Sequence, residues 1–203
     1  VAVGGAYAVV ANGAGGFALI DVSNPQDPES PYSVDFGGTA NAVAVSSPYA
    51  YVATEEAALN VVNVEIPFVA HAATLAGAAG ATDVTIQDDV AYVANERLTP
   101  VSISEPESPT LLDDALGPPP GGAVHGVALS GERAIGTQQD SGARVAVFDL
   151  EESPPVLGEY VETEGTVGKG LTVAGPWAYV AAGSEGLMIM DISDVDSPGS
   201  QYF

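Results

Sequence analysis

The residues best suited to hold a ligand recur at nearly equal intervals along this chain. Asn41, Thr82, His125 and Lys169 are separated by 41, 43 and 44 residues. Amide, hydroxyl, imidazole and ammonium groups offer several hydrogen-bond donors and acceptors, so together they suit a polar ligand. His125 is one of two histidines and Lys169 is the only lysine, which argues against an accidental alignment.

Carboxylates gather in two short segments that suit a hard cation. The candidate calcium ligands are Asp21, Asp27, Asp191, Asp194 and Asp196. Ca²⁺ takes several such oxygens, but the calcium loop with its invariant glycine is absent. Asp21, Asn63, Asp149 and Asp191 instead precede turns, where their side chains can bond nearby backbone N–H groups. The turn role is favoured, and we expect no cofactor, with calcium as the alternative.

Local signatures of common enzymes are missing. The chain has no G-x-S-x-G, no H-E-x-x-H and no phosphate-binding glycine loop followed by a helix. It has no cysteine, which excludes thiol catalysis and disulfides. A glycosidase-like carboxylate pair stays open, because two acids brought together by a fold leave no local motif.

The elements that must position these residues form a repeat of about 42 residues. Tyr49–Ala53 recurs as Val90–Ala94 and Trp177–Ala181, with weaker copies at Tyr7–Ala11 and Arg133–Thr137. Each repeat reads as four short strands separated by turn residues, without a helical period. Fixed periods of this length indicate stacked units that cannot bury their apolar faces alone.

Four strands in each repeat predict an all-β fold: one closed β-propeller domain with five four-stranded blades. The blades span approximately residues 1–36, 37–76, 77–116, 117–163 and 164–203. The chain starts in an innermost strand and ends in an outermost one. We therefore expect closure by packing of the first blade on the last, without a shared strand. A fragment of a larger propeller is the alternative.

Three single residues carry further expectations. Pro100 predicts a short or bent third strand in the third repeat, because proline cannot donate to the sheet ladder. His71 lies in an outer strand, where a surface or packing role is favoured over a ligand role. Trp177 takes the place of Tyr49 in its repeat and is expected to pack.

The polar residues of the opening paragraph stand just before the innermost strands, and Asp83 lies beside them. Equivalent positions of successive blades are related by rotation about the propeller axis, so we expect a polar ring at the channel mouth. Solvated loop residues at a variable position are the alternative. Turns between second and third strands add Arg97 and a mostly acidic rim made of Glu55, Glu56, Asn95, Glu96, Gln138, Gln139, Asp140 and Glu185.

The charge is strongly one-sided, with 27 acidic and 4 basic residues and a net charge of −23. This excludes nucleic acid and anionic lipid as partners, because both are bound through Lys and Arg. Every apolar run ends before the ~18 residues of a membrane helix, so we expect no membrane insertion. Salt screens self-repulsion of this size, which favours a halophilic or saline origin. An acidic extracellular protein is the alternative.

The segment Gly186–Asp194, preceded by Ala178–Gly183, resembles the LVIVD-repeat family. Units of that family resemble AYVA-x-G-x-x-G-L-x-I-I-D-I-S-D-P. The resemblance covers nearly the whole chain, is strong in repeats one and five, and weakens in repeats three and four. It implies a β-propeller of bacterial or archaeal surface or secreted proteins, and it implies no reaction.

These observations predict an extracellular or cell-surface binding or structural module without catalytic activity. Its partner would be a protein or carbohydrate ligand. The tentative ligand contacts are Asn41, Thr82, Asp83, Arg97, His125 and Lys169. The alternative is a hydrolase or lyase with its site at the channel mouth.

Overall fold

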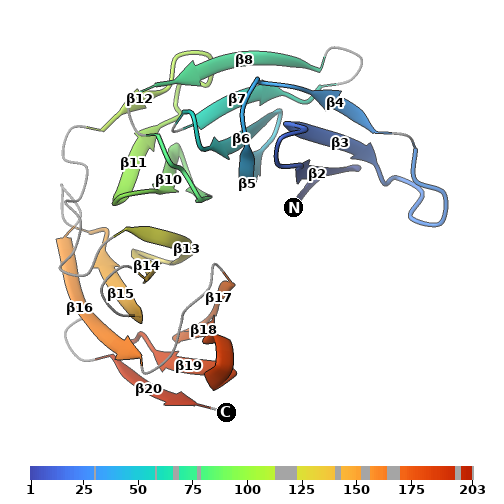
Figure 1. Cartoon of the computed structure of the whole chain (residues 1–203). Helices are drawn as coiled ribbons and strands as arrows, with labels where there is room; N and C mark the ends of the chain where they lie inside the picture. The colour runs from blue at the N-terminus through green and yellow to red at the C-terminus, as the bar shows by residue number, and fades with distance from the viewer. Residues whose placement is uncertain are drawn as a thin grey trace. The chain divides into compact units, whose positions relative to one another are not determined.

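The computed structural model describes residues 1–29, 31–57, 59–65, 69–76, 79–112, 123–139, 143–151, 156–163, 170–194 and 198–202. Within these residues, twenty strands form five four-stranded sheets, each built from four consecutive strands (Figure 1). We number the sheets 1 to 5 in chain order. The chain divides into two compact units, Val1–Val93 with Val101–Leu111 and Ala94–Pro100 with Leu112–Phe203.

The first three sheets contain strands β1 to β12. Sheet 1 consists of β1 (Ala2–Gly4), β2 (Tyr7–Ala11), β3 (Phe17–Asp21) and β4 (Tyr32–Val34). Sheet 2 consists of β5 (Ala40–Ser46), β6 (Tyr49–Thr54), β7 (Leu59–Asn63) and β8 (Ala70–Leu75). Sheet 3 consists of β9 (Asp83–Gln87), β10 (Val90–Ala94), β11 (Leu98–Ser102) and β12 (Thr110–Leu111).

The last two sheets contain strands β13 to β20 and a short 3₁₀ helix. Sheet 4 consists of β13 (Val124–Ser130), β14 (Arg133–Gln138), β15 (Ala143–Asp149) and β16 (Val156–Thr163). Sheet 5 consists of β17 (Leu171–Ala174), β18 (Trp177–Ala181), β19 (Leu187–Asp191) and β20 (Gly199–Tyr202), with the helix η1 (Gly183–Glu185) before β19. The five sheets match the five repeats expected from the sequence.

The same hydrogen bond closes every sheet after its third strand. In each case a backbone N–H just beyond the third strand donates to a carbonyl in the turn between the first and second strands. The donors are Val22, Val64, Ile103, Leu150 and Ile192, and the acceptors are Ala6, Pro48, Asp89, Glu132 and Pro176. This bond aligns the sheets residue by residue, so equivalent positions can be compared directly.

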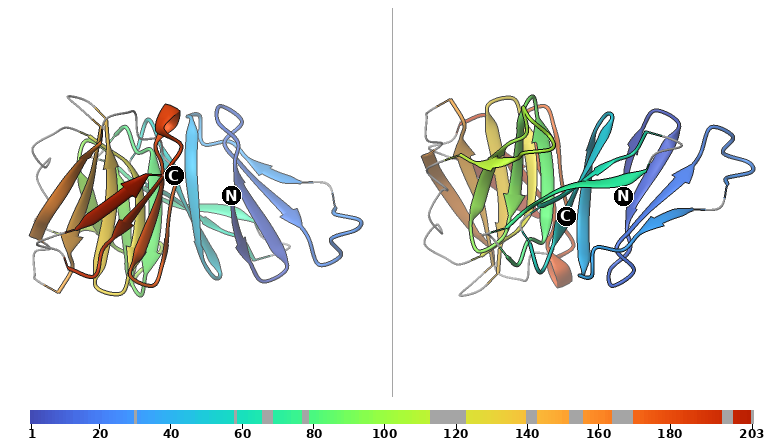
Figure 2. Two further views of the ribbon diagram at one scale, coloured as in Figure 1. Left: turned by 90° about the horizontal axis from the view of Figure 1, so that it is seen from below. Right: turned by 90° about the horizontal axis from the view of Figure 1, so that it is seen from above.

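Neighbouring sheets within each unit stand face to face (Figure 2), and the core lies between them. In sheet 2, Val52 and Val62 pack against sheet 1, whereas Tyr51 and Val61 pack against sheet 3. Ile135 of sheet 4 packs against sheet 5 in the same way. Burial on both faces explains why the central strands read as continuous apolar runs rather than alternating ones. A seam, as we use the word below, is the layer between two neighbouring sheets.

The structure corrects the expectation for Pro100. The strand β11 contains this proline and is five residues long, as β7 is. The carbonyl of Pro100 still accepts the Leu112 N–H at 3.1 Å, so the proline takes part in strand pairing as an acceptor although it cannot donate. The short strand in sheet 3 is the neighbouring β12, with two residues.

The expected packing role of Trp177 is also wrong in this structure, where 42% of the residue is exposed. Position 177 corresponds to Tyr49 and Arg133, since all three residues open the second strand of their sheet. Those two residues reach the following sheet. Tyr49 Oη donates to Glu107 Oε1 at 3.3 Å, and Arg133 Nη1 donates to the Ile192 carbonyl at 2.6 Å. Trp177 makes no such contact among the described residues and is exposed instead.

Candidate ligand-binding site

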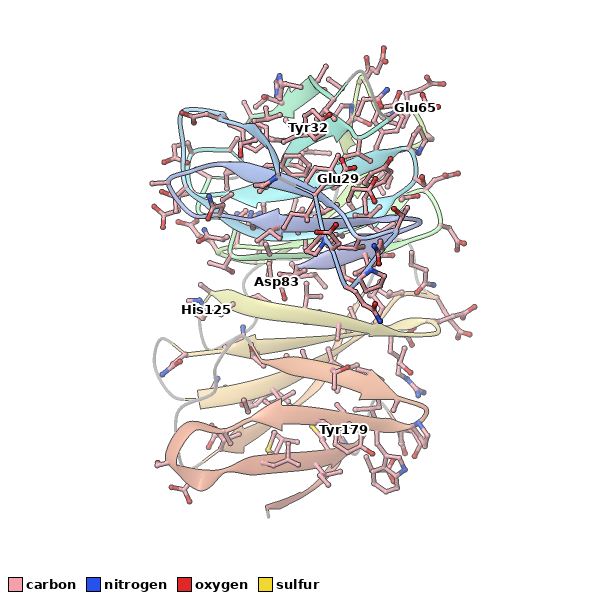
Figure 3. All side chains as sticks on the ribbon, turned by 90° about the vertical axis from the view of Figure 1, so that its right-hand side faces the viewer. Glu29, Tyr32, Glu65, Asp83, His125 and Tyr179 are labelled. Carbon is pink, nitrogen blue, oxygen red and sulfur yellow. The ribbon has the colours of Figure 1, made fainter. Side chains whose placement is uncertain are left out.

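Asn41 and His125 stand at the same structural position in sheets 2 and 4. Asn41 is the extra residue of a β-bulge in the pairing of β5 with β6, and His125 is the extra residue of a bulge between β13 and β14. A bulge redirects one side chain out of the regular ladder. Figure 3 shows His125 at one end of β13. The sequence predicted the alignment of these two residues, but not the bulges.

A backbone contact anchors the residue before each candidate position. The N–H group of this preceding residue donates to a carbonyl at the end of the second strand of the preceding sheet, or just beyond it. The pairs are Ala40 with Gly13 at 3.0 Å, Ala81 with Thr54 at 3.1 Å and Val124 with Asn95 at 2.8 Å. Asn41, Thr82 and His125 follow these anchors directly. The repeat therefore fixes the backbone position of each of the three residues, whatever side chain it carries.

The candidate side chains are partly buried, and two of them make hydrogen bonds to the backbone. Asn41 is partly buried, and its Nδ2 donates to the Ala81 carbonyl at 2.9 Å, which ties sheet 2 to sheet 3. Thr82 and His125 are also partly buried. Asp83 Oδ1 accepts the Val84 N–H at 2.9 Å. Asn41 thus has a structural use at the seam, in addition to any ligand contact.

Several residues of the expected site lie outside the described part of the chain. They are Lys169, Asp140 of the rim, Asp196 of the calcium alternative and the linker 117–122.

The residues expected to form an acidic rim differ in exposure. Glu55, Glu56, Glu96, Gln139 and Glu185 are exposed, and Arg97 is partly buried. Asn95 and Gln138, however, are 4% and 0% exposed. Asn95 is buried because its Oδ1 holds the turn together, accepting the Arg97 N–H at 2.9 Å and the Thr99 hydroxyl at 3.2 Å. Asn95 is therefore a structural residue of its turn rather than a rim residue.

The four carboxylate or amide residues that end the third strands make the expected turns. An Oδ1 atom accepts the N–H two residues later at 2.8 Å for Asp21 and Asn63 and at 2.9 Å for Asp149 and Asp191. Hydrogen bonds from the side chain and backbone of Ser23 lower the pKa of Asp21, and those from Ser193 lower the pKa of Asp191. The turn role predicted from the sequence is confirmed.

The calcium alternative receives no support from the described residues. No group of three His, Cys, Asp or Glu side chains there is placed to hold a metal ion. Asp27 and Asp194 are exposed, and Asp21 and Asp191 already bind their turns.

One carboxylate pair bears on the enzyme alternative. Glu132 and Glu151 line an open pocket of about 320 Å³ in sheet 4, together with Ser130, Arg133 and Asp149. A hydrogen bond with the Glu132 side chain, together with the charge of that residue, raises the pKa of Glu151. Both glutamates are exposed, so water reaches the pair freely. A catalytic acid is normally desolvated, whereas the pocket that holds this pair is open to water.

A chain of hydrogen-bonded polar side chains, which runs from the exposed His71 to the buried Thr54 in sheet 2, was not predicted from the sequence. His71 Nε2 lies 2.9 Å from Thr74 Oγ1, which donates to Asn60 Oδ1 at 2.7 Å. Asn60 Nδ2 then donates to Thr54 Oγ1 at 3.1 Å, and Thr54 Oγ1 donates to the Ala57 carbonyl at 3.1 Å. Because Thr74 gives its proton to Asn60, His71 Nε2 must act as the donor. His71 therefore braces the outer edge of sheet 2, in keeping with its expected surface or packing role.

The LVIVD repeat profile matches residues 1–35, 37–64, 78–114 and 168–200. The chain belongs to the LVIVD-repeat family. The first and third matches contain sheets 1 and 3, the second covers β5 to β7 of sheet 2, and the fourth covers β17 to β19 and the beginning of β20 in sheet 5. Sheet 4, where Ile135 and Gly136 replace the Tyr-Val of the repeat, lies in the unmatched stretch. A search of curated protein sequences gives no match.

Solved structures extend the comparison of this LVIVD chain at the level of fold. The computationally designed Ika8 protein matches with a TM-score of 0.67 and 10% identity, over 92% of this chain and 56% of that chain. The structure of U3-55K matches with a TM-score of 0.72 and 12% identity, over 98% and 64%. A candidate 6-phosphogluconolactonase from Bacteroides uniformis matches with a TM-score of 0.76 and 11% identity, over 98% and 67%.

At such low identity, these likenesses show the fold alone, since one fold carries many functions. With the LVIVD repeats and the four-stranded sheets, they establish a β-propeller fold. The chain spans little more than half of the designed protein's length. Among the described residues, no helix is long and apolar enough to cross a membrane.

Proposed function

We propose that this chain is a non-catalytic binding module of an extracellular or cell-surface protein. It would bind a neutral polar ligand, on a carbohydrate or a protein, through the residues that lead into the innermost strands. The contacts would come from Thr82, Asp83, Arg97, His125 and Lys169, with Asn41 dividing its amide between the ligand and the seam. We propose no resident cofactor.

The observation that carries the proposal is the shared bulge of Asn41 and His125. The first strand of a regular hairpin has no need of an extra residue, and a bulge is often used to aim a side chain at a functional site. The surrounding acidic turns disfavour anionic ligands and leave neutral polar ones. Enzyme action stays the weaker alternative, because the shifted carboxyl pair at Glu132 and Glu151 is open to water.

The five sheets would close into a single ring by packing the free face of sheet 5 on that of sheet 1. The repeat supports this, because the same two kinds of face already meet at the seams within each unit. Val9 and Leu19 pack forward onto sheet 2, as Ile135 and Val147 pack onto sheet 5. In sheet 5 the forward positions are held by Tyr179 and Ile189. A larger ring, completed by further blades, is the alternative.

The binding proposal is tested with a His125→Ala/Lys169→Ala double variant against a panel of neutral oligosaccharides. Binding seen with the natural chain should be lost in the double variant, while the melting temperature stays within about two degrees, as expected for substitutions that remove ligand contacts rather than packing. The matched control is His71→Ala, which removes the other histidine and should leave binding intact. Binding that survives the double variant would refute the assigned contacts.

A further inference from the structure

A groove opens at the seam between sheets 1 and 2, away from the candidate site. It has a volume of about 240 Å³ and is lined by Gly4, Tyr7, Val9, Val45, Ser47, Pro48, Val64 and Glu65. Asn41 lies near the beginning of β5, whereas Ser47 and Pro48 follow its last residue, Ser46. The groove and the candidate site therefore lie at opposite ends of the same strand.

At the seam between sheets 4 and 5, the position equivalent to the groove is occupied by side chains of the chain itself. Gly4 pairs with Tyr7 as Ser130 pairs with Arg133, so these residues are equivalent. Ser130 Oγ donates to the Gly175 carbonyl at 3.0 Å. Arg133 Nη1 donates to the Ile192 carbonyl at 2.6 Å. A hydroxyl and a guanidinium thus occupy this seam from within the chain.

The groove of sheets 1 and 2 lacks both of these groups. Gly4 replaces Ser130, and a Cβ added at Gly4 would lie 2.6 Å from Val45 Cγ1, so a serine does not fit there. Tyr7 replaces Arg133 and brings no cation. The counterpart of the Ile192 acceptor is Val64, because the N–H of Val64 closes sheet 2 just as that of Ile192 closes sheet 5.

The lining of the groove matches a guanidinium in charge as well as in shape. Glu65 is exposed, and its backbone is held by the hydrogen bond from its N–H to Asn63 Oδ1 at 2.8 Å. Glu65 follows directly on Val64, the counterpart of the acceptor that Arg133 uses. Tyr7 supplies an aromatic wall, and guanidinium groups stack on aromatic faces. The net charge of −23 attracts cationic ligands to the whole molecule.

We propose that this groove binds the side chain of an arginine from a basic peptide segment of a partner protein. The guanidinium would lie against Tyr7, pair with Glu65 and reach the main chain at Val64, as Arg133 reaches Ile192 in the other unit. Lysine fits less well, because its ammonium is a strongly hydrated point charge without a planar fork.

The test is a two-dimensional amide NMR titration with acetyl-arginine-amide, and acetyl-lysine-amide serves as the control probe. The arginine probe should shift the signals of Val45, Val64 and Glu65, and the lysine probe should bind more weakly. Glu65→Gln should weaken arginine binding about two- to fivefold, as expected for an exposed ion pair. Shifts of equal size with both probes, spread over the acidic surface, would overturn the proposal in favour of nonspecific attraction.

Two substitutions at the equivalent positions 7 and 133 make the test more specific. Tyr7→Arg should supply the missing guanidinium from within the chain and abolish binding of the probe. Arg133→Ala should open a second site, seen as new shifts at Gly175 and Ile192. Unchanged binding in a folded Tyr7→Arg variant would overturn the proposal. If that variant does not fold, the Glu65→Gln and Arg133→Ala variants decide the test. The proposed arginine site is refuted if Glu65→Gln does not weaken binding and Arg133→Ala produces no new shifts. His125→Ala should leave this binding unchanged, which separates the groove from the proposed site at the other end of β5.

Discussion

At the residue scale, residue type alone is a poor guide to the role of the aspartates and the asparagine that end the third strands. Asp21, Asn63, Asp149 and Asp191 have the oxygen atoms of metal ligands, yet in each case one of them accepts the N–H two residues later. Their recurrence in four repeats, with asparagine accepted in place of aspartate, pointed to this role in the sequence. Asn95 gave no such signal, because nothing in its sequence neighbours reveals that the turn folds around its side-chain oxygen.

This turn leads to the first prediction, at Asp191. Asp191→Ala should lower the melting temperature at pH 7, whereas Asp191→Asn should largely keep it, because Asn63 makes the same bond in sheet 2. The folded-state pKa of Asp191 is lowered, so its stabilising effect is present above the unfolded pKa of about 3.9 and is lost as the pH falls through the folded value. Thermal melts from pH 7 down to pH 2 check this. If Asp191→Asn loses as much stability as Asp191→Ala at pH 7, the turn bond is not what the carboxylate contributes.

At the scale of elements, the order and number of strands could be predicted because each repeat alternates apolar runs with turn residues. The bulges could not, since the register of β5 on β6 depends on how the two strands meet and on the anchor at Ala40. The outer strands β8 and β16 are also bulged where they pair with β7 and β15. Bulges on such edges hinder pairing with other chains, which suits an exposed strand.

Leu59 gives the prediction at this scale. It is fully buried at the seam of sheets 2 and 3, where it packs in one cluster with Tyr51, Val84 and Val93. Leu59→Ala should therefore cost about 2–5 kcal/mol of unfolding free energy, from lost transfer energy and the cavity left behind. Equilibrium unfolding in urea measures this cost. A value below about 1 kcal/mol would mean that the seams are not the core of the molecule.

At the scale of the whole molecule, the closure of the ring is the feature that the sequence predicts least well. The sequence shows which faces of the sheets are apolar, but not which faces meet. Leu187 offers a matched test, since it opens β19 as Leu59 opens β7, and yet it is 40% exposed. If sheet 5 is covered by another sheet in solution, Leu187→Ala should cost about as much as Leu59→Ala in the same urea experiment. A cost within about 0.5 kcal/mol, typical of surface positions, would contradict closure.

The charge gives a second prediction for the whole molecule. With a net charge of −23, the melting temperature should rise substantially between about 0.1 M and about 2 M KCl, because salt screens long-range repulsion. Sulfate must be compared with chloride, since excluded salts also strengthen hydrophobic burial. A melting temperature that stays flat in KCl would remove the halophilic interpretation.

The central claim is that the residues leading into the innermost strands bind a neutral polar ligand. The chain has two histidines, His125 at the proposed site and His71 in the outer strand β8, so labelling the histidine ring nitrogens gives one pair of signals, from Nδ1 and Nε2, for each residue. The most direct measurement is the nitrogen NMR spectrum of this labelled chain during titration with neutral oligosaccharides. The account predicts that a binding oligosaccharide shifts the His125 signals and leaves those of His71 in place. Saturable binding that moves His71 alone, or neither histidine, would contradict it.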